Sequence, residues 1–305
     1  MTGTTFERAR IFMHRNARPL DLARFEYHFE GGSKNDVMDA LSFYQNTDGG
    51  FAHAIEADCW NPNSTMLQAS TAAEIIREID WDDPFHPLIM GLLRWIESRE
   101  HFDGKTWALT VASNDDFPCA PWWRTQSVSS CHTGYNGTAL LAGFIVRYAA
   151  KGSAVFNLGV RIALEASDAL FSSGVQDMHT LACYLRMASL FERSGCAHLI
   201  KFDELEAALE KSVCGVVERD VSKWGGYVCR PSSLIRSKKS RYYRAVRELA
   251  DYECEFIRKS QREDGSWDVP WAWDGWPEQQ AVSRNWWRGQ IIIQNLLYLK
   301  GFDAL

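Results

Sequence analysis

The chain has 305 residues, of which 46% are hydrophobic and 24% charged, and its formal net charge is −6. This is the composition of a globular protein, and the negative charge argues against a nucleic-acid partner, which would need a basic surface. The N-terminus lacks an apolar core of signal-peptide length, and no stretch is long enough to span a membrane. We therefore expect a cytoplasmic protein without a transmembrane segment, for which peripheral contact with a membrane stays open.

Helical periodicity runs through almost the whole chain. About eleven helices are expected, over residues 4–16, 19–31, 34–46, 64–79, 86–100, 136–150, 153–171, 178–195, 202–220, 241–261 and 290–302. The eight cysteines are scattered along the chain, three of them within these segments, and include no C-x-x-C pair. They are typical of buried thiols in a reducing compartment.

Four of the expected helices end in a similar way. An apolar helical pattern leads into a polar turn with glycine, and an aromatic residue lies beside the turn, at Phe51, Trp107, Tyr227 and Trp267. Asp-Gly tolerates the positive φ that stops a helix and reverses the chain. The sequence therefore predicts an irregular repeat with roughly 40 to 60 residues between the marked turns.

Two kinds of helix alternate around these turns. Segments 64–79, 136–150 and 290–302 are apolar nearly all round, whereas 202–220 and 241–261 each have a strongly charged face. A helix that is apolar all round is covered on every side, and an amphipathic helix has one wet face. This alternation predicts an all-α fold, a single α/α-toroid domain over residues 1–305 with about six hairpins, apolar helices inside and amphipathic helices outside.

In such a toroid, the long connections would gather at one end. They span roughly 51–63, 105–135, 226–240 and 267–284 and contain most of the tryptophans. Long loops on one face of a rigid scaffold are a common place for a site. The alternative is that these indoles only close the end of the barrel by packing.

Two of the turns resemble a known motif. "FIRKSQREDGSW" is similar to the QW motif of the superfamily that contains squalene–hopene, oxidosqualene and class II diterpene cyclases, at Gln261, Gly265 and Trp267. "YQNTDGGF" is similar to it at Gln45, Gly49 and Gly50, with Phe51 in place of tryptophan. Protein prenyltransferase β subunits share the toroid. The resemblance implies that the glutamine and the aromatic residue tie neighbouring hairpins together.

The acid of class II cyclases belongs to a D-x-D-D motif at the start of an inner helix. Asp80, Asp82 and Asp83 have this spacing but follow an expected inner helix, so capping of the next helix is the preferred interpretation. At the position that the resemblance implies, residues 63–66 read Asn-Ser-Thr-Met. A hydroxyl is no strong Brønsted acid, so ordinary class II cyclisation is not expected.

Other carboxylates are the candidate catalytic groups. Glu56 and Asp58 lie among Ile55, Cys59 and Trp60, and burial in such company would raise a carboxyl pKa toward neutrality. The alternative is that one of them accepts backbone N–H groups and fixes the loop. Asp274, which lies among tryptophans, is the third candidate and could pair with them.

The candidate substrate-binding residues are aromatic side chains and histidines of the long connections. They are His53, Trp60, Trp122, Trp123, His132, Tyr135, Trp271, Trp273, Trp276 and Trp287. His132 and Tyr135 resemble the H-x-G-Y element of prenyltransferase β subunits. Asp177, His179 and Cys183 are zinc-ligand types, but Asp177 would point away from the other two on a helix. Neither a metal nor a cofactor is expected.

These features favour an isoprenoid-processing enzyme, an isomerase or lyase that binds an apolar small molecule and stabilises cationic intermediates with aromatic faces. The alternative is a carbohydrate-active α/α barrel, because tryptophan also stacks on sugars and paired carboxylates suit glycosidic chemistry. A third interpretation is a non-catalytic toroid that binds a ligand.

Overall fold

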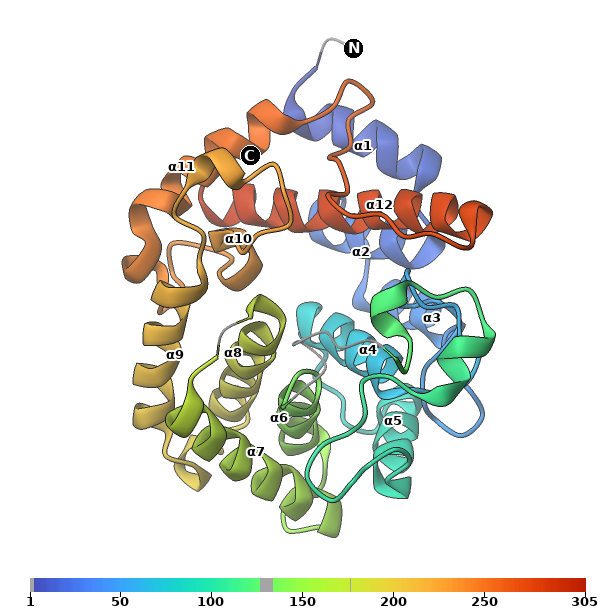
Figure 1. Ribbon diagram of the computed structural model, residues 1–305, viewed down its shortest axis with the longest axis vertical. Coiled ribbons are helices and arrows are strands. Elements are labelled where there is room, and N and C mark those ends of the chain that lie inside the picture. The colour runs from blue at the N-terminus through green and yellow to red at the C-terminus, as the bar shows by residue number, and fades with distance from the viewer. Residues whose placement is uncertain (1–2, 127–133, 176) are drawn as a thin grey trace. The chain divides into compact units, whose positions relative to one another are not determined.

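The computed structural model describes residues 3–126, 134–175 and 177–305. Over these residues the chain is all-α, as expected, and its β-structure consists of isolated bridges. The helices, shown in Figure 1, are α1 (Thr5–Asn16), α2 (Pro19–Phe29), α3 (Lys34–Ser42), α4 (Met66–Glu78), α5 (Pro87–Ser98), α6 (Thr138–Tyr148), α7 (Ala154–Ser173), α8 (Met178–Arg193), α9 (Phe202–Val216), α10 (Pro231–Leu234), α11 (Arg247–Ser260) and α12 (Pro277–Gly301).

The chain divides into two compact units. One contains residues 41–212, and the other is formed by residues 1–40 together with residues 213–305. The second unit therefore brings the two ends of the chain together. The ring of inner and outer helices that the sequence predicts stays a prediction, while the all-α architecture is confirmed.

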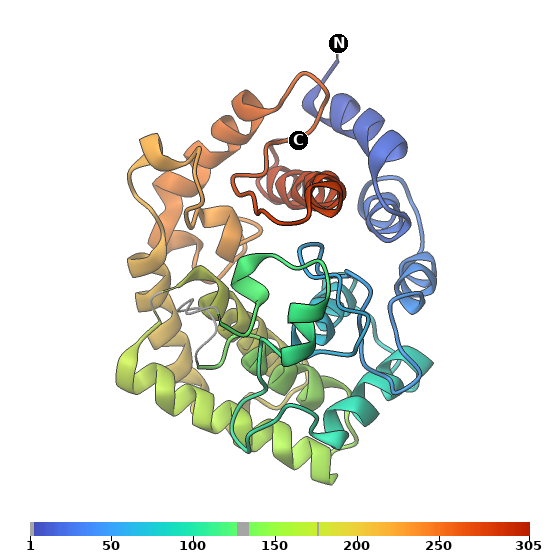
Figure 2. The same ribbon diagram turned by 45° about the vertical axis from the view of Figure 1, so that its right-hand side comes forward.

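Helix α6 is the centre of the 41–212 unit. It packs against α4, α7 and α8, which surround it in Figures 1 and 2. All but one of its residues are buried, and most residues of α4 between Met66 and Ile76 are buried as well. A helix that is apolar all round must be covered on all sides, so the sequence correctly identified α4 and α6 as interior helices. Thr65 caps α4, its Oγ1 accepting the Gln68 N–H at 3.3 Å.

Helix α12 has the corresponding place in the other unit, where it packs against α1, α2, α10 and α11. Its C-terminal half is buried along Gly289–Leu299. The expectation of a loop up to residue 284 is wrong, because α12 already begins at Pro277. Proline at N1 and Glu278 in the first turn favour a start there, since proline has no N–H to leave unpaired and the acid complements the helix dipole.

The two glutamine turns, at Gln45 and Gln261, have the same hydrogen bonds. Gln45 Nε2 donates to the carbonyls of Gly49, at 2.9 Å, and Leu88 in α5, at 3.0 Å. Gln261 Nε2 donates to the carbonyls of Gly265, at 2.9 Å, and Thr5 in α1, also at 2.9 Å. Each glutamine thus closes its own chain reversal with one hydrogen bond. With the other it binds a backbone carbonyl at the N-terminal end of another helix.

The glycines of these turns also correspond. Gly49 has φ +95° and Gly265 has φ +91°, values that favour glycine. A Cβ at Gly49 would lie 2.1 Å from the carbonyl oxygen of Gly91, and one at Gly265 would lie 2.1 Å from that of Arg8. The turn backbone therefore contacts the neighbouring helix directly, which only glycine permits.

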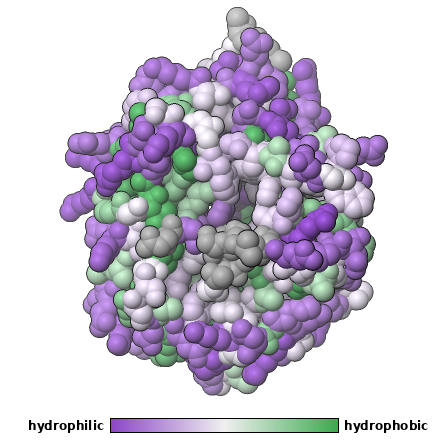
Figure 3. Space-filling model, viewed as in Figure 1, coloured by the Kyte–Doolittle hydropathy of each residue, from purple (hydrophilic) through white to green (hydrophobic). Residues whose placement is uncertain are grey.

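The surface is mostly polar on the face shown in Figure 3, where hydrophobic residues are scattered among hydrophilic ones. Within the described ranges, no helix combines the length and the apolar character that crossing a bilayer requires.

Candidate functional site

The loop between the first glutamine turn and α4 is buried in the 41–212 unit. It is joined to the segment around residue 119 by two backbone hydrogen bonds, from Trp60 N to Pro118 O at 2.9 Å and from Ala120 N to Asp58 O at 2.8 Å. Two successive non-glycine residues, His53 and Ala54, have positive φ of 59° and 58°. Such strained backbone persists only where the surroundings enforce it, so this loop has a well-determined conformation.

Glu56 and Asp58 are both buried in this loop, with 7% and 2% of their surfaces exposed. The backbone N–H of Asp58 donates to Glu56 Oε2 at 2.9 Å. Burial raises the pKa of Glu56 well above its ordinary value, and the negative charge of Asp58 acts in the same direction. The Asp58 N–H and the Trp123 side chain beside the carboxyl oppose this rise only in part.

The partners of this loop are polar side chains that the sequence patterns did not single out. Gln68 of α4 is fully buried, and its Oε1 accepts the Glu56 N–H at 2.9 Å while its Nε2 donates to the Cys59 carbonyl at 2.7 Å. Asn61 Nδ2 donates to Asn114 Oδ1 at 2.8 Å, and both residues are fully buried. A glutamine among the small and apolar residues at the start of α4 was the available signal for Gln68. The irregular segment around Asn114 offered none.

Besides Tyr135, three of the expected aromatic residues lie in the same unit as Glu56. Trp60, Trp122 and Trp123 are each half-buried. The indole N–H of Trp60 donates to the Ala57 carbonyl at 3.0 Å, and Asn114 Nδ2 donates to the Trp123 carbonyl at 2.8 Å. The exposed His53 is bound to Asn46 Oδ1 at 2.9 Å through Nε2. The structure thus gathers Glu56, Asp58 and Trp123, and it holds Trp60 in the same loop.

Two of the C-terminal tryptophans contact each other in the other unit. Trp271 lies edge-on to Trp287, with ring centroids 5.1 Å apart, and edge-on to Tyr227 at 5.4 Å. Trp273 is buried, and Trp276 is the residue that precedes α12. Asp274 is exposed. Trp287 lies well inside α12 and not before the last helix, which the sequence predicted to begin at residue 290.

One further aromatic candidate, Tyr135, lies beside a groove. His132 is outside the described residues. Tyr135 is buried beside a groove of about 500 Å³ that is lined by residues of α7 and by Gly104 and Lys105. Burial and the Glu165 carboxylate raise the pKa of Tyr135 to about 12. The lining of this groove includes Arg161, Glu165 and Asp168 but neither Glu56 nor Asp58.

The D-x-D-D letters have a structural role. Asp80 forms an ion pair with Arg193, and Asp82 forms one with Arg147 at 3.1 Å. Asp83 Oδ1 accepts the Phe85 N–H, so it closes a turn, and α5 begins only at Pro87 with His86 as its N-cap. The expectation that Asp83 caps this helix is therefore wrong, because the N-cap is His86, three residues further along the chain.

Asp177 is a helix cap. Its carboxylate accepts the N–H groups of His179 and Thr180 at the start of α8, at 3.0 and 2.9 Å. Cys183 accepts the Gly137 N–H through its sulfur at 3.2 Å. These bonds account for two of the three residues with zinc-ligand side chains.

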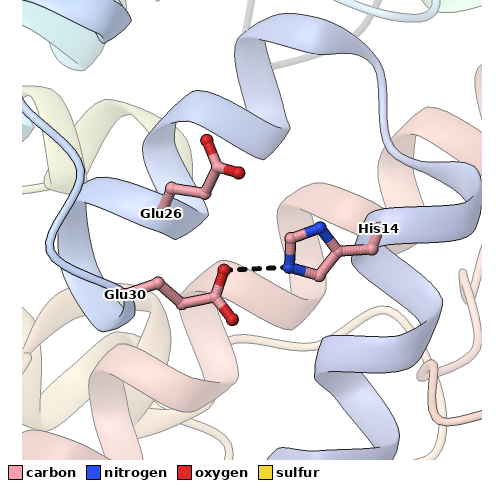
Figure 4. Close-up of side chains that lie close together, drawn as sticks. All are labelled: His14, Glu26 and Glu30. Carbon is pink, nitrogen blue, oxygen red and sulfur yellow. Dashed lines mark hydrogen bonds and ion pairs between the residues drawn. The ribbon is translucent and has the colours of Figure 1, made fainter.

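One group of metal-ligand types lies between α1 and α2, where Figure 4 shows His14, Glu26 and Glu30. His14 Nε2 lies 2.8 Å from Glu30 Oε2, and Arg10 forms an ion pair with the other oxygen of Glu30. Burial acts to raise the pKa of Glu30, but the hydrogen bonds of Arg10 and His14 outweigh it and lower the pKa. The guanidinium would repel a cation, so this group is best described as an ion-pair network.

A second buried glutamate provides an internal reference. Glu253 of α11 is fully buried, and its oxygens accept the Ser232 Oγ and N–H groups at 2.5 and 2.8 Å. Arg230 Nε lies 3.2 Å from Glu253 Oε1. Burial raises the pKa of Glu253, while Arg230 and Ser232 act to lower it. Arg230 is thus engaged in a structural ion pair with a buried carboxylate.

Another buried charge cluster was not predicted. Asp21 of α2 is fully buried and pairs with Arg18 at 2.6 Å and with Arg24 at 3.0 Å. The guanidinium of Arg18 lies 5.5 Å from the ring centroid of Trp286. The apolar spacing predicted α2 correctly, but these charged residues are on its buried side.

No known family, no curated protein and no solved structure matches this chain. The resemblance to the cyclases therefore depends on the two glutamine turns alone, and the geometry of the Glu56 loop is the main basis for assigning a function.

Proposed function

We propose that this protein is an enzyme that uses Glu56 as a general acid to begin a reaction on an isoprenoid substrate. The observation that carries the proposal is the buried carboxyl of Glu56, whose pKa is raised well above the ordinary value by burial and by Asp58. A carboxyl that keeps its proton near neutral pH can donate it to a weakly basic group.

The two carboxyls of the loop would have different roles in the reaction. Because like charges in one buried site disfavour double ionisation, the pair holds a proton more readily than either group would alone. The Asp58 N–H donates to Glu56 Oε2 and fixes the orientation of the Glu56 carboxyl. Glu56 would be the donor, and Asp58 would supply the negative charge that keeps the proton on Glu56.

The aromatic surroundings support a cationic intermediate. Protonation of an alkene or an epoxide leaves a positive charge on carbon, and the face of an indole attracts a cation. Trp123 lies beside the Glu56 carboxyl, and Trp60 belongs to the same loop. The choice of an isoprenoid comes from the resemblance of the two turns and extends this chemistry to a substrate class.

A carbohydrate substrate is the second candidate, and the proximity of two buried carboxyls in one loop favours it. A glycosidase needs one carboxyl that is protonated and one that is ionised. The Glu56–Asp58 pair would supply both, with tryptophan as the stacking surface for a sugar.

The test is turnover of a panel of polyenes, isoprenoid diphosphates and glycosides by the wild type and by Glu56→Gln. The proposal expects product from one isoprenoid, a loss of kcat of at least about 100-fold in the variant, and activity that falls as the pH rises through the Glu56 pKa. Glu253→Gln changes a buried carboxyl of the other unit and should retain turnover.

Each result of this test has a clear meaning. Turnover only of glycosides, lost in Glu56→Gln, would replace the isoprenoid by a sugar. Turnover of any substrate that survives in Glu56→Gln would remove Glu56 from the chemistry.

A further inference from the structure

Two cysteines face each other across the backbone junction that holds the Glu56 loop. Cys59 and Cys119 form an isolated antiparallel bridge, and the hydrogen bonds on either side run between their neighbours, from Trp60 N to Pro118 O and from Ala120 N to Asp58 O. Cys59 and Cys119 are therefore a non-hydrogen-bonded pair of the kind found in antiparallel sheets.

This type of pair has the backbone geometry of a disulfide. In non-hydrogen-bonded antiparallel pairs the Cα atoms are about 4.5 Å apart and the side chains point to the same face. Disulfides need Cα separations of about 4.4–6.8 Å. Bond formation between the two sulfurs would thus require side-chain rotation and little movement of the backbone.

The two thiols already interact. Their mutual interaction is the largest influence on the pKa of each thiol, and it lowers the pKa of Cys59 and raises that of Cys119. Cys59 is therefore the more acidic thiol of the pair, and the thiolate is the form that reacts with oxidants. Both residues are fully buried, so only a very small oxidant, or one that arrives during a local opening of the loop, can reach them.

We propose that Cys59 and Cys119 are an oxidation site, at which a hydroperoxide converts the two thiols into a disulfide that locks the Glu56 loop to the segment after Pro118. The proposal does not depend on the enzymatic function. It concerns a covalent bond within one compact unit, between residues 60 positions apart in the sequence.

The chemistry balances with hydrogen peroxide as the oxidant. The Cys59 thiolate attacks one peroxide oxygen, the O–O bond breaks, and hydroxide leaves with a Cys59 sulfenic acid as the product. The Cys119 sulfur then attacks the sulfenic sulfur, the S–O bond breaks, and a second hydroxide leaves. The two thiol protons convert both hydroxides to water, so two thiols and one peroxide give one disulfide and two waters.

The disulfide would close a long loop that contains α4 and α5. A crosslink across a long loop stabilises mainly by restricting the unfolded chain. The melting temperature of the oxidised protein should therefore be higher by several degrees, and reduction by dithiothreitol should reverse the increase. The oxidised loop should also exchange its amide hydrogens more slowly around Glu56.

The experiment treats the reduced full-length chain with stoichiometric hydrogen peroxide, alkylates the remaining thiols after denaturation, and maps the peptides by mass spectrometry. The expected result is one disulfide between Cys59 and Cys119, with the other cysteines alkylated. Cys196→Ser, which changes another buried cysteine of the same unit, should form the same disulfide.

Two variants test the order of the steps. Cys119→Ser should accumulate a Cys59 sulfenic acid that a 1,3-dione reagent traps, and Cys59→Ser should form neither the disulfide nor an adduct at Cys119. The proposal is overturned if both thiols of the wild type remain alkylatable under peroxide that oxidises other cysteines, or if Cys59 proceeds to the sulfinic acid without a disulfide. The wild-type peptide map decides this even where a variant does not fold.

Discussion

The two glutamine turns are alike in themselves, but the segments that come after them differ. Gln45 and Gln261 make the same two kinds of hydrogen bond, and Gly49 and Gly265 contact a neighbouring helix in the same way. After the first turn the chain buries two carboxyls next to each other, whereas after the second turn Asp268 pairs with Arg284 at 2.6 Å and stays exposed.

This difference shows that the glutamine turns have a structural role, whereas the candidate chemistry belongs to the residues that follow the first turn. The turn is a means of fastening one helix to another, and it has the same geometry whether or not a buried acid is nearby. The candidate catalytic residues of the molecule lie between the first glutamine turn and α4. A sequence motif that identifies the turn therefore says little about the reaction.

The largest expected effect comes from the turn glycines. Gly49→Ala and Gly265→Ala would each place a methyl group within 2.1 Å of a backbone carbonyl, at a φ that alanine rarely adopts. We expect each to lower the free energy of unfolding by roughly 2–5 kcal/mol, as measured by urea denaturation. Gly104→Ala has positive φ but open space around its Cβ and is the matched control, with a smaller loss. Equal losses in the free energy of unfolding at all three glycines would show that the close approach to the neighbouring helix does not contribute to stability.

The glutamine side chains should have the next largest effect. Gln45→Ala removes two hydrogen bonds to partly buried carbonyls, and Gln261→Ala also removes the acceptor for Arg8. Each substitution should lower the free energy of unfolding by about 1–3 kcal/mol, and Gln261→Ala should have the larger effect. Urea denaturation again provides the measurement. Gln126 is exposed, and Gln126→Ala is the control. If Gln45→Ala or Gln261→Ala lowered the free energy of unfolding by less than this control, the role of these side chains in joining helices would be contradicted.

The Glu56 carboxyl should make stability depend on pH. Because its folded-state pKa is raised, the folded protein binds more protons than the unfolded chain between the ordinary glutamate pKa and the folded pKa. The contribution of Glu56 to stability is therefore full at low pH and is lost as the pH rises, with a slope of up to about 1.4 kcal/mol per pH unit.

Glu56→Gln should remove this slope, because the neutral amide has no proton to lose. The measurement is the free energy of unfolding of both proteins from pH 5 to pH 8, where the difference between them should grow steadily in favour of the variant. Parallel curves would mean that the Glu56 carboxyl is already ionised in the folded protein.

The smallest effect is expected after the second turn. Asp268→Asn breaks the pair with Arg284, but both side chains are substantially exposed. Exposed ion pairs contribute at most about 1 kcal/mol, so the melting temperature should change little and less at high salt. A loss as large as that in Gln261→Ala would show that the second loop has a structural role that its exposure hides.

The sequence predicted the helices better than their ends. Regular apolar spacing indicated nearly every long helix, and the two interior helices α4 and α6 were recognised because they are rich in small and apolar residues. The start of α12 was missed because tryptophans and turn formers surround Pro277, although proline at N1 was a usable signal.

The candidate site was predictable in part. The apolar neighbours of Glu56 indicated its burial, since a charged group in such company is seldom solvated. The partners Gln68 and Asn114, and the pairing of Cys59 with Cys119, depend on contacts between distant segments. Local periodicity has no information on such contacts, so only the folded chain reveals them.

A carbon-13 NMR titration of the glutamate side-chain carboxyls tests the central claim most directly. Two signals should remain in the protonated form above the ordinary glutamate pKa, one assigned to Glu56 by its absence in Glu56→Gln and one to Glu253 by its absence in Glu253→Gln. The Glu56 signal should keep its proton to the higher pH, because Asp58 adds to the effect of burial while Arg230 opposes it at Glu253. A Glu56 signal that titrates with the exposed glutamates would contradict the assignment of Glu56 as a buried acid.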